Sequence, residues 1–454
     1  MLEVEELLEI CEQALKYLKK AGAQQYEVQI ESDFNISVSA EMNEVAEAKA
    51  GIESRICVRC VINKSLGFAM TNSLKDKALI QTAEAAVASA KIGPPDKYWV
   101  DFPTKVTNYP QVNGLYDKQL LEKDVGDFVA QTHLIIEKSL DKAKNPDITV
   151  NNSISGMYVN HSAVMNSLGL ENSMKNTAQY ASLSLVARVG DQTTPGCFDF
   201  VISRDRNLNY DSMIEETVTD VKKAMIIQKV KPSEKIDVLL SPLVLGSLFD
   251  NVLTPAFLGD NLIRGTTPLT EKLGEQIVAE TLTIEDDGLL ENGGGTAPMD
   301  DEGVPSQKTT LIENGILKNF LFDHYWGTRQ GKSSTGNGIR LESGEIYIRP
   351  RNFHIKAGND SFEDLIDVKE GYLVKGVQGA HTANSQSGEF SVVLNPCYLI
   401  RDGDVKSGAL GGMISGNIYD FLTRTSMIGN KTKTISNFVL PYLRIKDVPV
   451  SAKE

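Results

Sequence analysis

Residues 286–305 read DDGLLENGGGTAPMDDEGVP, and residues 308–317 follow with KTTLIENGIL. In the second run, Asn314-Gly315 lies between two β-prone segments, which is the strongest short-range signal for a type I′ hairpin turn. The carboxylates and glycines of the first run predict loops at strand edges whose backbone can approach a ligand closely. By composition alone, ordinary turns are the simpler interpretation.

Two further blocks continue this pattern, GVQGAHT at residues 376–382 and GGMISGN at residues 411–417. In this order the blocks resemble the TldD/PmbA peptidase family, formerly labelled modulators of DNA gyrase, and within it the PmbA branch, also called TldE. The resemblance covers nearly the whole chain and is stronger after residue 230. It implies membership of a metallopeptidase family whose members hydrolyse peptides.

Length and composition restrict the class of protein. A chain of 454 residues is expected to form two or more domains, and 41% hydrophobic with 23% charged residues is ordinary for a soluble protein. The net charge of −14 and the lack of a Lys/Arg-rich run argue against nucleic-acid binding. The acidic N-terminus does not resemble a signal peptide, and no apolar run is long enough to span a bilayer. We therefore expect a cytoplasmic protein without a membrane partner.

The order of predicted elements indicates an α+β fold. A helix–strands–helix unit is expected twice before residue 230, which suggests a duplication without a residue-level repeat. Lys229–Lys235 reads as a polar linker, so the predicted domains are an α+β domain at 1–229 and a β-rich, barrel-like domain at 236–454. The expected elements are helices at 3–21, 74–91, 118–143 and 210–228, strands at 26–30, 35–39, 42–50, 53–63 and 66–71, and a meander at 147–203.

The cysteines predict neither a disulfide framework nor a metal site. There are five, at irregular spacing. Cys57 and Cys60 form a C-x-x-C motif inside a strand-like run, where residues three apart point to opposite faces. No second Cys or His pair lies nearby to complete a zinc site, so we interpret both as structural.

The resemblance also identifies where catalytic residues would stand. In the TldD branch one helix carries H-E-x-x-x-H, in which the histidines bind zinc and the glutamate is the general base, and a cysteine near the C-terminus is the third ligand. Here the corresponding helix opens at Ser241, and the family positions fall on Asp250, Asn251, Pro255 and Ile428. Asn251 cannot accept a proton and Pro255 has no side-chain donor atom. We therefore predict no catalytic residue, no zinc site and no cofactor in this chain.

The resemblance implies that a TldD-type subunit supplies the zinc. The expected assembly is a heterodimer that cleaves small or unfolded peptides, with a homodimer possible when that partner is absent. The loops at 300–303 and 378–388 are candidates for lining the peptide path. Their candidate peptide-binding residues are Asp300, Asp301, Glu302, Gly303, Gln378, His381, Ser387 and Gly388.

Two alternatives stay open at the level of sequence. One is a self-sufficient metallohydrolase in which His324, His354 and His381 converge with Glu302, because a zinc site needs about three protein ligands. The other is a dimeric binding protein without enzymatic activity that needs no TldD-type partner. Metal in the purified lone chain would favour the first alternative, and absence of any gene for a TldD-type partner would favour the second.

Overall fold

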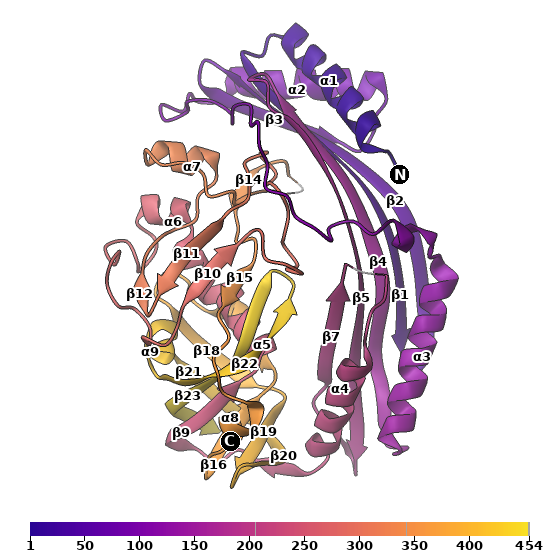
Figure 1. Cartoon of the computed structure of the whole chain (residues 1–454), viewed down its shortest axis with the longest axis vertical. Coiled ribbons are helices and arrows are strands. Elements are labelled where there is room, and N and C mark those ends of the chain that lie inside the picture. Colours follow the sequence, from indigo (N-terminus) through magenta and orange to yellow (C-terminus); the bar gives the residue numbers. More distant parts are fainter. Residues whose placement is uncertain (205, 342, 453–454) are drawn as a thin grey trace.

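The computed structural model describes residues 1–204, 206–341 and 343–452. Its N-terminal part is a long, curved antiparallel sheet with helices, and its C-terminal part is rich in strands and lies against the concave side of that sheet (Figure 1). The predicted α+β fold class is confirmed. In the part of the chain that the structure describes, no helix is long and apolar enough to cross a membrane.

The N-terminal sheet has the strand order β3-β2-β1-β4-β5-β6, and β7 pairs with β5. Strands expected separately at 26–30 and 35–39 form one strand, and those at 42–50 and 53–63 form another. The reason is that β1 pairs along its whole length with β2 and with β4, so the polar residues between the expected strands stay in the sheet. The strands are β1 (Gln25–Glu41), β2 (Glu44–Ile62), β3 (Ser65–Thr71), β4 (Ile148–Asn166), β5 (Glu171–Val189), β6 (Gln192–Thr193) and β7 (Cys197–Ser203).

Four longer helices accompany this sheet: α1 (Val4–Ala21), α2 (Asp76–Ile92), α3 (Val125–Ala143) and α4 (Asp211–Ala224). The predicted helix at 118–143 is divided into η1 (Lys118–Glu122) and α3, because the Asp124 carboxylate accepts a hydrogen bond from the Asp127 backbone and starts a new helix. The helix expected at 210–228 ends at Ala224. The next strand, β8 (Ile227–Lys229), pairs with β20 of the C-terminal sheet.

The C-terminal sheet has the order β12-β11-β10-β15-β23-β9-β16-β19-β20-β8 and branches at β23, which also pairs with β21 and β22. Its buried residues form the largest apolar core of the described chain. The strands of its main path are β9 (Ser233–Leu240), β10 (Ile284–Asp287), β11 (Lys308–Glu313), β12 (Ile316–Leu317), β15 (Phe353–Ile355), β16 (Glu370–Val374), β19 (Cys397–Arg401), β20 (Asp404–Leu410) and β23 (Phe438–Ala452). Beside them lie β17 (Val377–Gln378), β18 (Glu389–Leu394), β21 (Gly412–Asn417), β22 (Thr425–Ile435) and a separate pair, β13 (Gly338–Arg340) and β14 (Ile346–Ile348).

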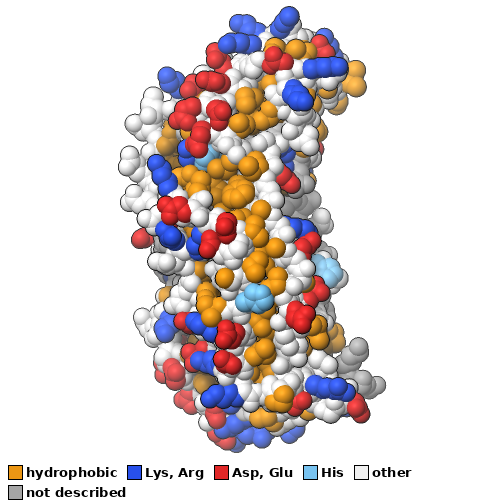
Figure 2. All heavy atoms as spheres, turned by 90° about the vertical axis from the view of Figure 1, so that its right-hand side faces the viewer, with side chains coloured by type: hydrophobic (Ala, Val, Ile, Leu, Met, Phe, Trp, Pro, Cys, Tyr) orange, Lys and Arg blue, Asp and Glu red, His pale blue; other side chains and the backbone are white. Residues whose placement is uncertain are grey.

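One outer face of the molecule is drawn in Figure 2. Lys and Arg side chains lie among Asp and Glu side chains there, around a band of hydrophobic side chains. Basic and acidic side chains are therefore mixed over most of the described part of this face.

The predicted turn between β11 and β12 is confirmed, with φ of 50° at Asn314 and 79° at Gly315. Gly315 is also enclosed: its carbonyl accepts a hydrogen bond from the Ile277 backbone at 2.9 Å, and an added Cβ would lie 2.7 Å from the Val278 carbonyl oxygen. Glycine is thus required both by the turn and by the surrounding backbone.

Gly315→Ala is expected to lower the free energy of unfolding by about 2–4 kcal/mol, because left-handed strain and overpacking add. Gly331→Ala is the matched control, since Gly331 has a φ of 67° and nothing within 4 Å of an added Cβ. The control should cost about 1 kcal/mol, the strain alone. Urea unfolding of the two variants measures the difference, and equal losses would contradict the close approach.

Candidate functional site

The segment after Ser241, expected from the resemblance to correspond to the zinc-binding helix, is not a regular helix. Helix α5 (Pro242–Leu248) passes into a π-helical turn, η2 (Phe249–Leu253), then into a 3₁₀ turn, η3 (Thr254–Phe257), and α6 (Gly259–Arg264) follows. On an ideal α-helix, residues five apart are separated by roughly 140°. The i→i+5 bonding of a π-turn instead brings such residues toward one face. Position 250 lies on the π-turn and position 255 on the 3₁₀ turn, so the backbone between them departs from an ideal α-helix.

The side chains at positions 250, 251 and 255 are not the set of donors that a zinc site needs. Asp250 is exposed, and its Oδ1 lies 3.6 Å from Nη2 of Arg349. Asn251 donates a hydrogen bond from Nδ2 to the Ser247 carbonyl at 2.8 Å. Pro255 offers only its backbone carbonyl. Among the three positions, Asp250 alone carries a side chain that ionises to a metal ligand.

The fourth family position, Ile428, lies on a strand and not on the helical segment that carries the other three. Ile428 is on β22, 7% exposed, and its backbone N–H donates to Oδ2 of Asp360 at 3.0 Å. Zinc sites use imidazole, thiolate or carboxylate donors, with three protein ligands and a water at catalytic sites. A set of one aspartate, one amide, one proline and one isoleucine does not fit that ion, so no hydrolytic step through zinc is derived from these residues.

The predicted peptide loop at 300–303 is largely enclosed in the fold. Asp300 is fully buried, and its Oδ1 accepts hydrogen bonds from the backbone of Glu302 at 3.0 Å and of Val304 at 2.9 Å. Its Oδ2 accepts from the Gly338 backbone at 2.8 Å. Burial, together with the charge of Glu302, raises the pKa of Asp300 well above its ordinary value. The side chain of Asp300 thus connects its own loop with the segment that contains Gly338.

Two other residues of this loop also make internal contacts. Asp301 accepts a hydrogen bond from the Arg340 backbone at 2.7 Å, and burial raises the pKa of Asp301. The carbonyl of Gly303 accepts from the Tyr109 hydroxyl at 2.8 Å, and an added Cβ there would contact Leu170. Contacts within the fold therefore account for Asp301 and Gly303.

Glu302 belongs to a buried ion cluster that joins the part built on the N-terminal sheet to the part built on the C-terminal sheet, called the two domains below. Nη2 of Arg59, on β2, lies 2.8 Å from Oε1 of Glu27 on β1 and 3.0 Å from Oε1 of Glu302. Arg340, on β13, reaches the same oxygen of Glu27. Burial opposes ionisation of Glu27, but the two guanidinium groups hold its pKa below the ordinary value. Sequence reasoning missed this cluster, although Arg59 stands out as a charge inside an apolar strand run.

A second buried carboxyl borders the cluster. Asp323 caps α7 (His324–Arg329) by accepting from the Trp326 backbone at 2.7 Å. Burial and the neighbouring charge of Glu302 raise the pKa of Asp323 to about 8. Oε2 of Glu302 accepts a hydrogen bond from the His324 backbone at 2.9 Å. The domain junction is therefore held by charges that have little contact with water.

The second predicted peptide loop lies elsewhere. It contains η4 (Ala380–Thr382), which contacts the π-turn η2, so this loop lies beside the degenerate zinc positions. Gln378, His381 and Ser387 are exposed, whereas Gly388 is buried at a φ of 82°. The structure thus separates the two predicted loops. One borders the π-turn and the other forms part of the domain junction.

The three histidines of the first alternative do not gather. Nε2 of His324 lies 3.1 Å from Oδ1 of Asp101, and His354 stands on β15 opposite Glu285 of β10. His381 is exposed on η4. Among the described residues no group of three His, Cys, Asp or Glu side chains is placed to hold a metal. The five cysteines are buried and free, Cys57 and Cys60 included.

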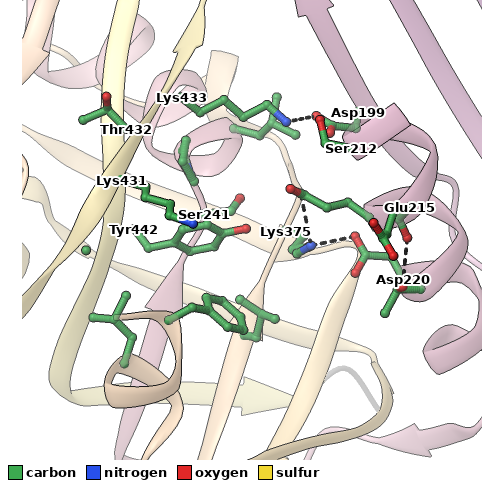
Figure 3. A pocket seen from close by; sticks show the side chains of 18 of the residues that line it. Asp199, Ser212, Glu215, Asp220, Ser241, Lys375, Lys431, Thr432, Lys433 and Tyr442 are labelled. Carbon is green, nitrogen blue, oxygen red and sulfur yellow. Dashed lines mark hydrogen bonds and ion pairs between the residues drawn. The ribbon is translucent and has the colours of Figure 1, made fainter. Parts of the chain in front are cut away.

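Sequence reasoning also missed a cavity of about 820 Å³ between the two domains. Strand β7 and helix α4 contribute one side of it. The start of α5, helix α8 (Phe362–Ile366) and strand β22 contribute the other (Figure 3). Its signal in the sequence was weak, because its lining comes from segments more than 200 residues apart.

Comparisons with known proteins agree with this architecture. Residues 233–452 match the PmbA/TldA metallopeptidase C-terminal domain, and residues 26–90 match PmbA/TldA metallopeptidase domain 1. The crystal structure of TldE from Thermococcus kodakarensis is similar, with a TM-score of 0.91 and 32% identity over 98% of this chain and 100% of that one.

Two sequence relatives extend the match. An uncharacterized protein of Methanocaldococcus jannaschii is 30% identical over 90% of this chain and 92% of its own length. A metalloprotease TldD homologue of Haemophilus influenzae is 27% identical over 86% of this chain and 82% of its own. The chain belongs to the PmbA/TldA metallopeptidase family, and the predicted resemblance is confirmed.

Proposed function

We propose that this chain is the non-catalytic, TldE-type subunit of a two-chain zinc peptidase that cleaves small or unfolded peptides in the cytoplasm. The observation that carries the proposal is the π-turn at residues 249–253 with the 3₁₀ turn that follows it, an irregular helical segment that presents Asp250, Asn251 and Pro255. Asn251 has no basic group for a general base, and Pro255 has no donor for a metal. A TldD-type partner with H-E-x-x-x-H would supply both functions.

Within such a heterodimer, this chain would form part of the wall around the peptide and would contribute no catalytic group. The loop at 378–388 lies beside the π-turn and is exposed at Gln378, His381 and Ser387, so it would border a peptide at the partner's site. The buried contacts of Asp300 and Glu302 assign those two side chains to the rigidity of the domain junction instead. Without the partner, two copies of this chain would pair with each other.

Metal analysis tests the proposal directly. The chain purified without an affinity tag should hold no stoichiometric zinc, and its complex with a TldD-type chain should hold about one zinc per heterodimer. Asp250→Ala in this chain should leave the zinc content of the complex unchanged. About one zinc per lone chain, retained through dialysis, would overturn the proposal and favour a self-sufficient metallohydrolase. Failure to form any complex with a TldD-type chain would favour a separate binding protein.

A further inference from the structure

The interdomain cavity has the size and the lining of a binding site. Its volume of about 820 Å³ lies within the range of roughly 300–1,000 Å³ that ligand pockets span. Aromatic side chains line it from both domains, with Phe198 and Phe200 on β7 and Phe362 and Tyr442 opposite. Asp250, Asn251 and Pro255 are not among its lining residues, so it is distinct from the degenerate zinc positions.

One wall of this cavity is an unpaired strand edge. Among the described strands, β7 pairs only with β5. The backbone N–H of Phe200 donates to Oδ1 of its neighbour Asp199 at 2.8 Å, so it points away from β5. In an antiparallel strand, residues two apart direct their backbone groups to the same side. The N–H and C=O groups of Phe198 and Ile202 therefore also face the open edge, where an extended chain can add a strand.

Ion pairs connect the walls of the cavity. Lys433, on β22, pairs with Asp199 of β7, and Nζ of Lys375 lies 2.8 Å from Oδ2 of Asp220 on α4 (Figure 3). Asp199 is 5% exposed, and its Oδ2 has no hydrogen-bond partner among the described residues. A buried carboxylate oxygen without a partner is costly. Asp199 thus has capacity for one more donor than the chain provides.

The charge of the lining indicates the chemistry of that donor. Carboxylates outnumber lysines, which disfavours a phosphate or another polyanion and favours a cationic group. The carboxylates are Asp199, Glu215, Glu216, Asp220, Asp360 and Glu363, and the lysines are Lys223, Lys375, Lys431 and Lys433.

We infer that this cavity binds an extended polypeptide segment that adds a strand to β7 and places a Lys or Arg side chain at Asp199. Main-chain hydrogen bonds with the open edge would supply affinity that is independent of sequence, and the aromatic side chains would receive apolar residues on either side. The basic side chain would bind the free Oδ2 of Asp199, while Lys433 stays on Oδ1, and the two cations would repel each other. The inference rests on the proposed function in that it gives the non-catalytic subunit its own contact with the peptide.

Substitution of each partner of the Asp199–Lys433 ion pair tests the inference. The probes are two fluorescein-labelled octapeptides that are rich in β-branched residues and differ only by a central Lys or Glu, and binding to the full chain is measured by fluorescence anisotropy. Asp199→Asn should weaken binding of the Lys peptide about tenfold, because a charge-assisted hydrogen bond is lost. Lys433→Met should strengthen it, because the cation that repels the Lys side chain of the peptide is gone. Neither variant should change binding of the Glu peptide in this opposed way.

A purely structural ion pair behaves differently, since removal of either partner would then shift binding in the same direction. That result, or the absence of saturable binding of either peptide to the wild-type chain, would overturn the inference. If a variant fails to fold, the unaltered protein still decides. Two versions of the Lys peptide are prepared, one N-methylated at its odd-numbered residues and one at its even-numbered residues. Only one version should lose binding, because alternate residues direct their N–H groups to the same side of a strand. Equal binding of both N-methylated peptides would refute strand addition.

This outcome is separable from that of the proposed function. Binding at the cavity without zinc-dependent hydrolysis in any two-chain mixture would refute the proposed function alone. Hydrolysis by a mixture, with no peptide binding to this chain, would refute the cavity site alone.

Discussion

Peptide hydrolysis is expected to be negligible for this chain alone and to appear when a TldD-type chain is added. The physical reason is that hydrolysis needs a metal-activated water and a general base. Asn251 cannot accept a proton, and the positions of Asp250, Pro255 and Ile428 do not fit zinc. A quenched fluorogenic peptide, followed before and after mixing of the two chains, measures the effect. Because a general base alone contributes about 10²–10⁴-fold, the gain on mixing should exceed a hundredfold.

Two substitutions serve as controls for this experiment. Changing the glutamate of the partner's H-E-x-x-x-H to glutamine should abolish the activity of the mixture. Asp250→Ala in this chain should change the rate only modestly, because that carboxylate is exposed and pairs with Arg349 across 3.6 Å. Chelator-sensitive cleavage by this chain alone would make it an independent enzyme. Full activity of the partner without it would remove any need for this subunit.

Arg59→Met is expected to lower the free energy of unfolding by about 3–5 kcal/mol, the usual cost of breaking a buried ion pair from one side. The side chains of Arg59, Glu27 and Glu302 are 6%, 0% and 3% exposed. Methionine fills much of the same volume but leaves Glu302 without its guanidinium and Glu27 with Arg340 alone. Because Glu302 belongs to the C-terminal domain, the loss should also loosen the junction between the domains.

Urea unfolding followed by far-ultraviolet circular dichroism measures this loss. Lys49→Met, on the same strand, is the matched control, because Lys49 and Glu47 form an exposed pair whose side chains are 69% and 54% exposed. Such a pair typically contributes at most about 1 kcal/mol. Equal effects of the two substitutions would show that the buried cluster does not hold the domains together.

The local elements were predictable because their causes are local. Helix α1 follows from apolar residues at helical spacing and ends at Gly22 in the left-handed region. The turn at Asn314-Gly315 follows from two residues that tolerate positive φ. The lengths of β1 and β2 were underestimated, since the polar central residues of β1 pair with β2 on one side and β4 on the other, and those of β2 pair with β1.

The candidate site was predictable only in part. The expectation that Asn251 and Pro255 provide neither a base nor a ligand depends on side-chain identity, so the sequence and the resemblance were sufficient to state it. The carboxylates at 300–302 suggested a binding loop, yet Asp300 accepts from the backbone of Gly338, Asp301 from that of Arg340, and Glu302 pairs with Arg59. Nothing in the sequence distinguished these two interpretations, because both use the same residue types.

The sequence by itself determined the family, the α+β class, the type I′ turn and the donors absent from the π-turn, all of which depend on residue identity and short-range order. The tertiary structure alone decided which charges meet. Glu27 and Arg340 are 313 positions apart, and Lys433 and Asp199 are 234 apart. Such pairs form where the curved sheet packs against the C-terminal domain. The packing excludes water, and a charge that has lost its water needs an oppositely charged partner. The interdomain cavity arises in the same way, where that packing leaves the edge of β7 open.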